Sequence, residues 1–460
     1  MKPLIPLLFL SIFPTILQAQ RPINVLWVVL DDLRTELGCY GVEGVISPNI
    51  DRFAAKAMLF ENAYAQYPVC NPSRASFLTG LRPEEVGVLS NKLPLRRVQP
   101  DIVTAPQLFR QNGYYTIGIG KIFHLSVDEP TRGRVLFEDP KSWNFFLDRI
   151  PNVTPLGKKG EGRNLTGGAL KWAHWRAAEG GDADQADGQN ADALIEKLEE
   201  VHEEPFFIGY GIHKPHDPFV APKEYFDLYP KDTIKLEQEP SDRSELEPGA
   251  IPNRKTFSEF TDAERIEFKR AYQACVTFAD AQLGKVFDAM DRLELWDSTM
   301  VIVMSDHGYH LGQKGWWNKV TLFETGSRVP FIFWHPLAPG MGSSTDSLVE
   351  LVDIYPTLVE LAGLRAPHRF SGKSLLGVLA DPNVEVKDAA YSQVKRGAYS
   401  GLSVRSARWR YTEWGEDGKR GVELYDHSKD PEEHYNLARN PEYASVRERM
   451  KDLLDRGFSR

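Results

Sequence analysis

The stretch INVLWVVLDD, residues 23–32, runs from an apolar segment straight into Asp31 and Asp32. Three later apolar runs end in the same way, each followed by an ionisable side chain: YYTIGIG before Lys121, PFFIGYGI before His213, and MVIVMS before Asp306. Helical patterns such as IDRFAAKAMLF and DAQLGKVFDAMDRL lie between these runs. Alternating strands and helices predict an α/β fold, with a sheet that helices cover on both faces.

The ionisable residues that follow these runs are expected to share one site. Ligands of open α/β sheets bind beyond the carboxyl ends of the strands, so side chains placed there meet at one edge. Taken singly, an aspartate caps a helix, a histidine is a satisfied structural residue, and a lysine is solvated. Their joint occurrence favours a functional site that contains Asp31, Asp32, Lys121, His124, His213, Asp306 and His307.

This mixture of side chains indicates ester hydrolysis. Clustered carboxylates repel one another unless a cation lies between them, and oxygen ligands without a thiolate cluster favour Ca²⁺ or Mg²⁺ over zinc. Lys121, Lys319 and Arg74 would hold an oxygen-rich anion through charge-assisted hydrogen bonds. His124 and His213 would transfer protons near neutral pH. A metal and a basic clamp around a nucleophile predict hydrolysis of a phosphate or sulfate ester.

The segment CNPSRASFLTG, residues 70–80, begins with a cysteine just before a predicted helix. A thiolate at a helix N-terminus is activated, yet exported thiols tend to be paired or oxidised. Cys70 is therefore either an ordinary buried cysteine or a residue that does not remain a cysteine. The chain has only 3 cysteines, so at most one disulfide forms, and Cys39 and Cys275 read as small core residues.

CNPSRASFLTG matches the signature C-x-P-S-R-x-x-x-L-T-G, and with it the chain resembles the sulfatase family. GKIFH, GYGIHKPHDPF and SDHGYHLGQKGWWNK are similar to the iduronate-2-sulfatase subgroup, including a histidine three residues after the lysine of GKIFH. The resemblance implies an α/β, alkaline-phosphatase-like sulfatase fold. Such a fold has a large mixed sheet sandwiched by helices and a small antiparallel sheet in a C-terminal subdomain.

The resemblance also implies a modified nucleophile and a bound metal. A dedicated maturation enzyme converts the signature cysteine, here Cys70, to Cα-formylglycine, and one hydroxyl of its hydrate attacks sulfur. One calcium ion is bound by the residue at position 70 together with Asp31, Asp32, Asp306 and His307. Many sulfatases have asparagine at the position of His307.

Further catalytic roles follow from the same resemblance. Arg74 stabilises the formylglycine hydrate, while Lys121 and Lys319 clamp the sulfate oxygens. His124 matches the histidine that helps eliminate sulfate, and His213 matches the one that protonates or holds the leaving oxygen. Lys319 has an alternative interpretation as a surface lysine.

Four further residues are expected to contact the substrate: His216, Asp217, Trp316 and Trp317. Aromatic faces pack against sugar rings and polar groups fix hydroxyls, although either tryptophan would equally serve to cover the core. The predicted activity is exo-acting hydrolysis of a sulfate ester on a carbohydrate, such as a 2-sulfated uronate. The alternatives are a phosphonate monoester or phosphodiester hydrolase with the same site, and a non-catalytic glycan-binding relative, which would be expected to have lost site residues.

The 460 residues are enough for one large and one smaller domain. Residues 1–20 read as a signal peptide, residues 21–379 as the catalytic domain, and residues 380–460 as a subdomain with an antiparallel sheet and a helix. Segments 151–190 and 232–262, rich in Gly, Asp, Glu and Pro, are expected to form surface loops.

Composition and length restrict the partners and the location. A formal charge of −9 argues against a nucleic-acid-binding protein. No stretch after the first twenty residues is long and apolar enough to span a bilayer. We therefore expect an exported bacterial protein, periplasmic or secreted, without a membrane anchor once the signal peptide is removed. The sequence leaves its oligomeric state open.

Overall fold

The computed structural model describes residues 22–127, 134–136, 138–148, 153–240, 243–253 and 255–458. The expected signal peptide, residues 1–20, lies outside the described residues. Among the described helices, none combines the length and the apolar character that a membrane crossing requires.

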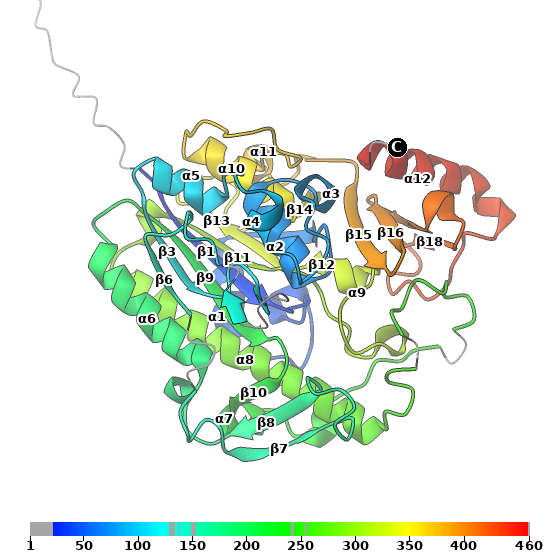
Figure 1. The fold of residues 1–460 in the computed structure, drawn as a ribbon, viewed down its shortest axis with the longest axis horizontal. Helices are drawn as coiled ribbons and strands as arrows, with labels where there is room; N and C mark the ends of the chain where they lie inside the picture. Colours follow the sequence, from blue (N-terminus) through cyan, green and yellow to red (C-terminus); the bar gives the residue numbers. More distant parts are fainter. Residues whose placement is uncertain are drawn as a thin grey trace, which may run out of the picture.

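A nine-stranded mixed sheet forms the centre of the large domain, in the order β12-β2-β13-β11-β1-β9-β3-β6, with β14 also paired to β2 (Figure 1). Neighbouring strands from β11 to β6 are parallel, whereas β13 runs antiparallel to both β11 and β2. The strands are β1 (Asn24–Asp31), β2 (Met58–Tyr64), β3 (Tyr115–Gly120), β6 (Phe145–Leu147), β9 (Phe206–Pro215), β11 (Thr299–Ser305), β12 (Arg328–Val329), β13 (Phe331–Trp334) and β14 (Ser344–Glu350).

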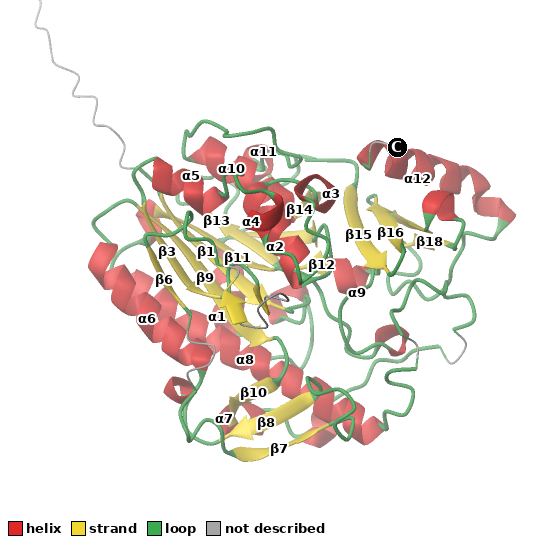
Figure 2. Ribbon diagram, in the orientation of Figure 1, coloured by secondary structure: helices red, strands yellow, loops and turns green. Residues whose placement is uncertain are grey.

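Helices cover both faces of this sheet, as predicted. Alternate residues of β1 point to opposite faces: Leu26 and Val28 join one buried cluster, and Val25 and Trp27 join the other. The first face is covered by α1 (Pro48–Lys56), α6 (Ala186–Val201) and α8 (Asp262–Arg292), and the second by α2 (Cys70–Thr79), α5 (Ala105–Gln111), α10 (Ile354–Leu361) and α11 (Leu376–Ala380) (Figure 2). Shorter helices are α3 (Pro83–Val86), α4 (Leu95–Val98), α7 (Lys223–Asp227) and α9 (Glu324–Ser327).

Two local predictions were wrong. The helical pattern IDRFAAKAMLF ends at Lys56, because Met58 and Leu59 instead pair with Phe333 and Ile332 of β13. The region 151–190, expected to be loops, contains β7 (Gly160–Asn164) and β8 (His174–Ala178). These strands form a small sheet with β10 (Phe219–Pro222), which pairs with β8. Because β10 lies far from β8 in the sequence, local patterns do not indicate this pairing. A further hairpin consists of β4 (Leu125–Val127) and β5 (Arg134–Leu136).

The C-terminal region forms the predicted small antiparallel sheet. Its strands are β15 (Ala390–Arg396), β16 (Tyr399–Arg405), β17 (Trp409–Trp414) and β18 (Val422–Asp426), and α12 (Ala444–Gly457) packs on them. Figure 1 shows this sheet in orange beside the large domain. The boundary between residues 379 and 380 stays a prediction.

Candidate active site

Four ionisable residues meet where β1 and β11 end side by side. Leu30 of β1 lies opposite Ser305 of β11, so Asp31, Asp32, Asp306 and His307 follow from adjacent strand ends. All four side chains are fully buried. Asp32 has a φ of +65°, which is unfavourable for a residue with a side chain and persists only when neighbours hold it. Its N–H donates to Asp306 Oδ1 (3.2 Å), and its carbonyl accepts from the Tyr272 hydroxyl (2.8 Å).

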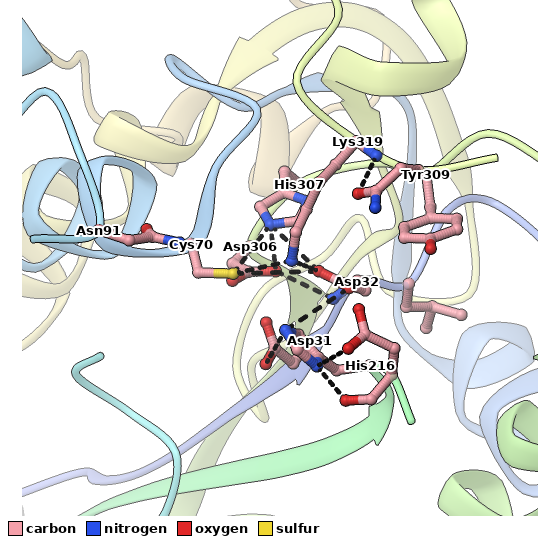
Figure 3. A network of polar contacts seen from close by, with 12 residues as sticks. Asp31, Asp32, Cys70, Asn91, His216, Asp306, His307, Tyr309 and Lys319 are labelled. Carbon is pink, nitrogen blue, oxygen red and sulfur yellow. Dashed lines mark hydrogen bonds and ion pairs between the residues drawn. The ribbon is translucent and has the colours of Figure 1, made fainter. Parts of the chain in front are cut away.

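Cys70 is the first residue of α2 and lies against this carboxylate cluster (Figure 3). Its Sγ is 3.3 Å from His307 Nε2 and 3.1 Å from Lys319 Nζ. Burial alone would raise the pKa of the Cys70 thiol, but the nearby charges of Lys121, Lys319 and His307 lower it well below the ordinary value. The position therefore stabilises negative charge on the atom attached there.

Arg74 follows Cys70 by one helical turn and so lies on the same side of α2. Its Nε is 2.9 Å from Asp306 Oδ2, and its Nη2 is 3.3 Å from Asp31 Oδ1. Nη1 also donates to the carbonyl of Ile122, at 3.1 Å. The signature spacing thus ties the helix N-terminus to both carboxylate-bearing strand ends and to the loop after β3.

Two buried lysines complete the charged cluster. Lys121 follows β3, and its Nζ contacts Asp31 Oδ2. Lys319 reaches in from the loop after β11, with Nζ 2.5 Å from Asp32 Oδ1. Burial lowers the pKa of each ammonium, but the adjacent carboxylates more than offset that effect, so both pKa values are raised. Lys319 is only 8% exposed, so its alternative interpretation as a surface lysine was wrong.

The histidines line the approach to this cluster. Burial lowers the pKa of His124 to about 4, while a hydrogen bond to Cys70 acts in the opposite direction. His213 Nε2 lies 3.1 Å from Asp148 Oδ1. His216 Nε2 lies 3.8 Å from Asp32 Oδ2 and 4.0 Å from Asp31 Oδ2, so His216 belongs beside the carboxylates. Its expected contact with substrate stays a prediction.

Sequence reasoning missed two aspartates that hold the loop after β9. Asp148 pairs with His213, and Asp187 in the first turn of α6 accepts the backbone N–H groups of His213 and Lys214, at 2.9 Å each. Asp148 follows β6, so the rule applied to the other strand ends would have found it. Asp187 had no such signal, because its partners lie 26 and 27 residues later.

The cluster fits a hard divalent cation. Ligand atoms of Asp31, Cys70, Asp306 and His307 lie within 4.8 Å of one another. Within the described part of the chain, Asp31 Oδ1 and Asp32 Oδ2 are buried but accept no hydrogen bond. Buried carboxylate oxygens that accept no hydrogen bond are costly, and a cation would satisfy them. A site of three carboxylates and one imidazole suits Ca²⁺ or Mg²⁺.

A cavity of about 420 Å³ opens from the cluster and has the size of a small-ligand site. Asp31, Lys121, His124, His213, His216 and Asp217 line it. Trp316 and Trp317 are buried elsewhere, in an aromatic cluster with Phe257, Phe260 and Phe268. Trp316 Nε1 donates to the Lys319 carbonyl at 2.8 Å, which supports the lysine loop. This placement matches the core role, and sugar contact by either tryptophan stays untested.

Comparison with known proteins identifies the family. The Sulfatase family model matches residues 23–364, and a model described as N-sulphoglucosamine sulphohydrolase, C-terminal, matches residues 312–458. A sulfatase from Formosa agariphila is 33% identical over 451 residues, covering 94% of this chain and 86% of the relative. Iduronate 2-sulfatase from Homo sapiens is 32% identical over 476 residues, covering 85% of each chain.

A likeness in fold accompanies these matches. The phosphonate monoester hydrolase of Agrobacterium radiobacter superposes with a TM-score of 0.79 at 22% identity, covering 95% of each chain. An identity of 22% shows a shared fold alone. The family model, by contrast, matches residues 23–364, and the two sequence relatives cover most of the chain. The protein thus belongs to the sulfatase family, as a sulfuric ester hydrolase.

Proposed function

We propose that this enzyme removes a sulfate ester from a carbohydrate, with residue 70 in its formylglycine form as the nucleophile. One observation carries the proposal: Cys70 is fully buried between His307 and Lys319 at the carboxylate cluster, in a pocket that stabilises negative charge. The hydrated aldehyde supplies an oxygen nucleophile in place of the thiol. Its formation requires a maturation enzyme as a partner.

The metal in this proposal is calcium, held by Asp31, Asp32, Asp306 and His307. A divalent ion bound there supplies positive charge to the sulfate oxygens and to the nucleophile. Asp31 Oδ1 and Asp32 Oδ2, which accept no hydrogen bond from the described residues, support this assignment.

The other residues act on the sulfate and on protons. Lys121 and Lys319, both buried and charged, bind sulfate oxygens through charge-assisted hydrogen bonds. Arg74 keeps its guanidinium against Asp306 and Asp31 and orients α2. His124, whose pKa is lowered to about 4, is neutral at pH 7 and accepts a proton at position 70. His213, held by Asp148, donates to the leaving oxygen.

The preferred substrate class is a sulfated sugar, with a 2-sulfated uronate as the leading member. Similarity to human iduronate 2-sulfatase supports that choice. The cavity of about 420 Å³ suits the terminal unit of a glycan, so we propose exo action.

The proposal also includes export to the periplasm or the medium, with cleavage of the signal peptide near residue 20. N-terminal sequencing of the protein produced in a bacterial host tests it.

The deciding experiment measures sulfate release by protein co-expressed with a maturation enzyme, after mass spectrometry has shown the aldehyde at residue 70. The substrates are a 2-sulfated uronate disaccharide, other sulfated sugars, an aryl sulfate and a phosphonate monoester. Preference for the uronate supports the whole proposal, and turnover of another sulfated sugar changes only the substrate. Cleavage of the phosphonate alone would indicate a phosphonate monoester hydrolase, an activity found in another protein with this fold.

A further inference from the structure

The cavity beside the active site has a far wall built by the small sheet of β7, β8 and β10. Arg176 of β8, Val220 of β10 and Lys158 just before β7 line this wall, opposite the end formed by Asp31 and Lys121. Arg176 pairs in register with Val220, which follows the His213–Asp217 loop by only a few residues. The chain therefore connects this wall directly to the catalytic loop.

Strand alternation accounts for the direction of Arg176. Its neighbours Trp175 and Ala177 are buried in the core between the small sheet and α8, and Trp175 Nε1 donates to Glu267 Oε2 of α8 at 3.0 Å. Successive side chains of a strand point to opposite faces. Arg176 therefore faces away from α8, on the side where the cavity lies.

Within the described part of the chain, the cations of this wall have no carboxylate partner, unlike those of the catalytic end. Lys121 is paired with Asp31, whereas neither Arg176 nor Lys158 forms an ion pair among the described residues. Among the described residues, the Arg176 side chain donates one hydrogen bond, from Nη1 to the Lys158 carbonyl at 2.5 Å. This bond orients the guanidinium and leaves its other N–H groups available.

A third cation strengthens the positive field. Lys214 also lines the cavity, and its Nζ donates to the carbonyls of His216 (3.1 Å) and Pro218 (2.7 Å) and forms no ion pair with the described residues. Burial lowers the pKa of His174, and the charges of Arg176 and Lys214 lower it further, so both cations act on one region.

The carboxylates of the same cavity offset this field only in part, because Lys121, Lys158, Arg176 and Lys214 line it against Asp31, Asp187 and Asp217. Asp187 is used by the backbone N–H groups of His213 and Lys214, and Asp31 by Lys121 and Arg74. Asp217 lies beside His216, with their charged groups 3.8 Å apart. The far wall therefore presents net positive charge to anything bound in the cavity.

We infer that Arg176, assisted by Lys158 and Lys214, binds a second anionic group of the substrate while its ester sulfate occupies the Lys121 and Lys319 end. The inference rests on the proposed sulfatase function and adds a selectivity to it. The second group is a carboxylate or a further sulfate, since a guanidinium binds either in a bidentate manner. Neutral sulfated sugars lack this contact.

Binding to a catalytically silent form tests the site independently of turnover. In the Cys70→Ala background, titration calorimetry compares a 2-sulfated uronate disaccharide, a disulfated hexosamine and a singly sulfated neutral hexose. Arg176→Gln is expected to weaken binding of both doubly anionic ligands about 10- to 100-fold, and of the neutral hexose sulfate less than about twofold. A loss for only one doubly anionic ligand identifies the second group as carboxylate or sulfate.

Matched variants separate this role from general charge. Arg163→Gln on β7 and Lys159→Gln remove cations that do not line the cavity, and both should leave the three affinities unchanged. Equal losses for all three ligands with Arg176→Gln, or no loss for any, would overturn the inference. In the mature enzyme, absence of sulfate release from every ester would refute the proposed function, whereas release without an Arg176-dependent preference refutes only the second-anion site.

Discussion

The protein contains two buried ion clusters that differ in one respect. At the active site, Asp31 and Asp32 each keep a buried oxygen without a hydrogen bond from the described residues. In the second cluster, where the loop after β11 meets the C-terminal sheet, Glu324 and Glu433 have partners on every oxygen. Those partners are Tyr64, Arg405, Arg410, His427 and the Glu324 N–H.

The difference shows which cluster serves packing and which serves chemistry. A buried ion network is tolerated when every member is satisfied, and an incomplete one is costly unless another group completes it. The Glu324–Arg410–Glu433 network needs nothing further, so its role is to join two sheets. The active-site cluster is complete only with a cation and a substrate anion. The free-energy cost of its unsatisfied buried oxygens is therefore explained by function.

The largest expected effect separates catalysis from folding. Cys70→Ala should lower sulfate release by about a thousandfold or more, because the precursor of the nucleophile is gone. Its thermal unfolding midpoint should change little, since one small buried side chain is replaced by another. Release within tenfold of the wild-type rate would remove residue 70 from the mechanism.

A substitution in the Glu324–Arg410–Glu433 network should instead lower stability. Arg410→Met leaves Glu324 and Glu433 buried without their main cation and should lower the free energy of unfolding by about 3–5 kcal/mol, measured by urea denaturation. Arg52→Met, which removes an arginine whose ion pair with Asp288 is exposed on both sides, should cost much less. Equal costs for the two variants would contradict the contrast between complete burial and surface pairing.

Added calcium should stabilise the folded protein only by binding at the active-site cluster of Asp31, Asp32 and Asp306. Ca²⁺ at about 100 times its dissociation constant is expected to raise the free energy of unfolding by about 2.7 kcal/mol. Asp306→Ala should lose this response and Glu324→Gln should keep it, as read from thermal unfolding with and without the ion. A calcium response that survives in Asp306→Ala would place the ion elsewhere.

A buried neutral histidine in the loop after β11 gives a pH-dependent effect. Burial lowers the pKa of His310 to about 3; its ring contacts the Gln313 carbonyl and the Thr321 hydroxyl. The unfolded chain binds the proton more readily, so this contribution to stability is present above pH 6.5 and is lost as the pH falls toward 3.

The expected slope is about 1.4 kcal/mol for each pH unit below 6.5. Urea denaturation at pH 7 and pH 4.5 should therefore show a smaller loss for His310→Asn than for the wild type. Identical losses would mean that His310 titrates normally.

Much of the active site was predictable because its residues follow strands in a fixed way. Apolar runs ending in Asp31, Lys121, His213 and Asp306 marked one sheet edge, and parallel pairing brings them together. The order of the strands was not predictable from local patterns. Contacts such as that of Asp187 with the loop after β9 depend on how distant segments pack.

The far wall of the cavity, formed by β7, β8 and β10, escaped prediction for a related reason. β7 and β8 contain Gly160, Gly162 and charged residues, which locally favour loops, and only their pairing with each other and with β10 makes them strands. Arg176 consequently had no recognisable role in the sequence. For Trp316 and Trp317 the sequence left two roles open, since an aromatic pair has the same pattern in a core and in a sugar site.

Under the proposed function, the complete burial of Cys70 requires its modification to come before folding is complete. Once the sheet has closed, no modifying enzyme reaches that side chain. His307, which contacts Cys70, lies 237 residues farther along the chain. At a synthesis rate of about 5–20 residues per second, roughly 10–50 s pass between the synthesis of Cys70 and that of His307. Under the proposed function, this separation between Cys70 and His307 sets the interval in which the nascent chain is open to modification.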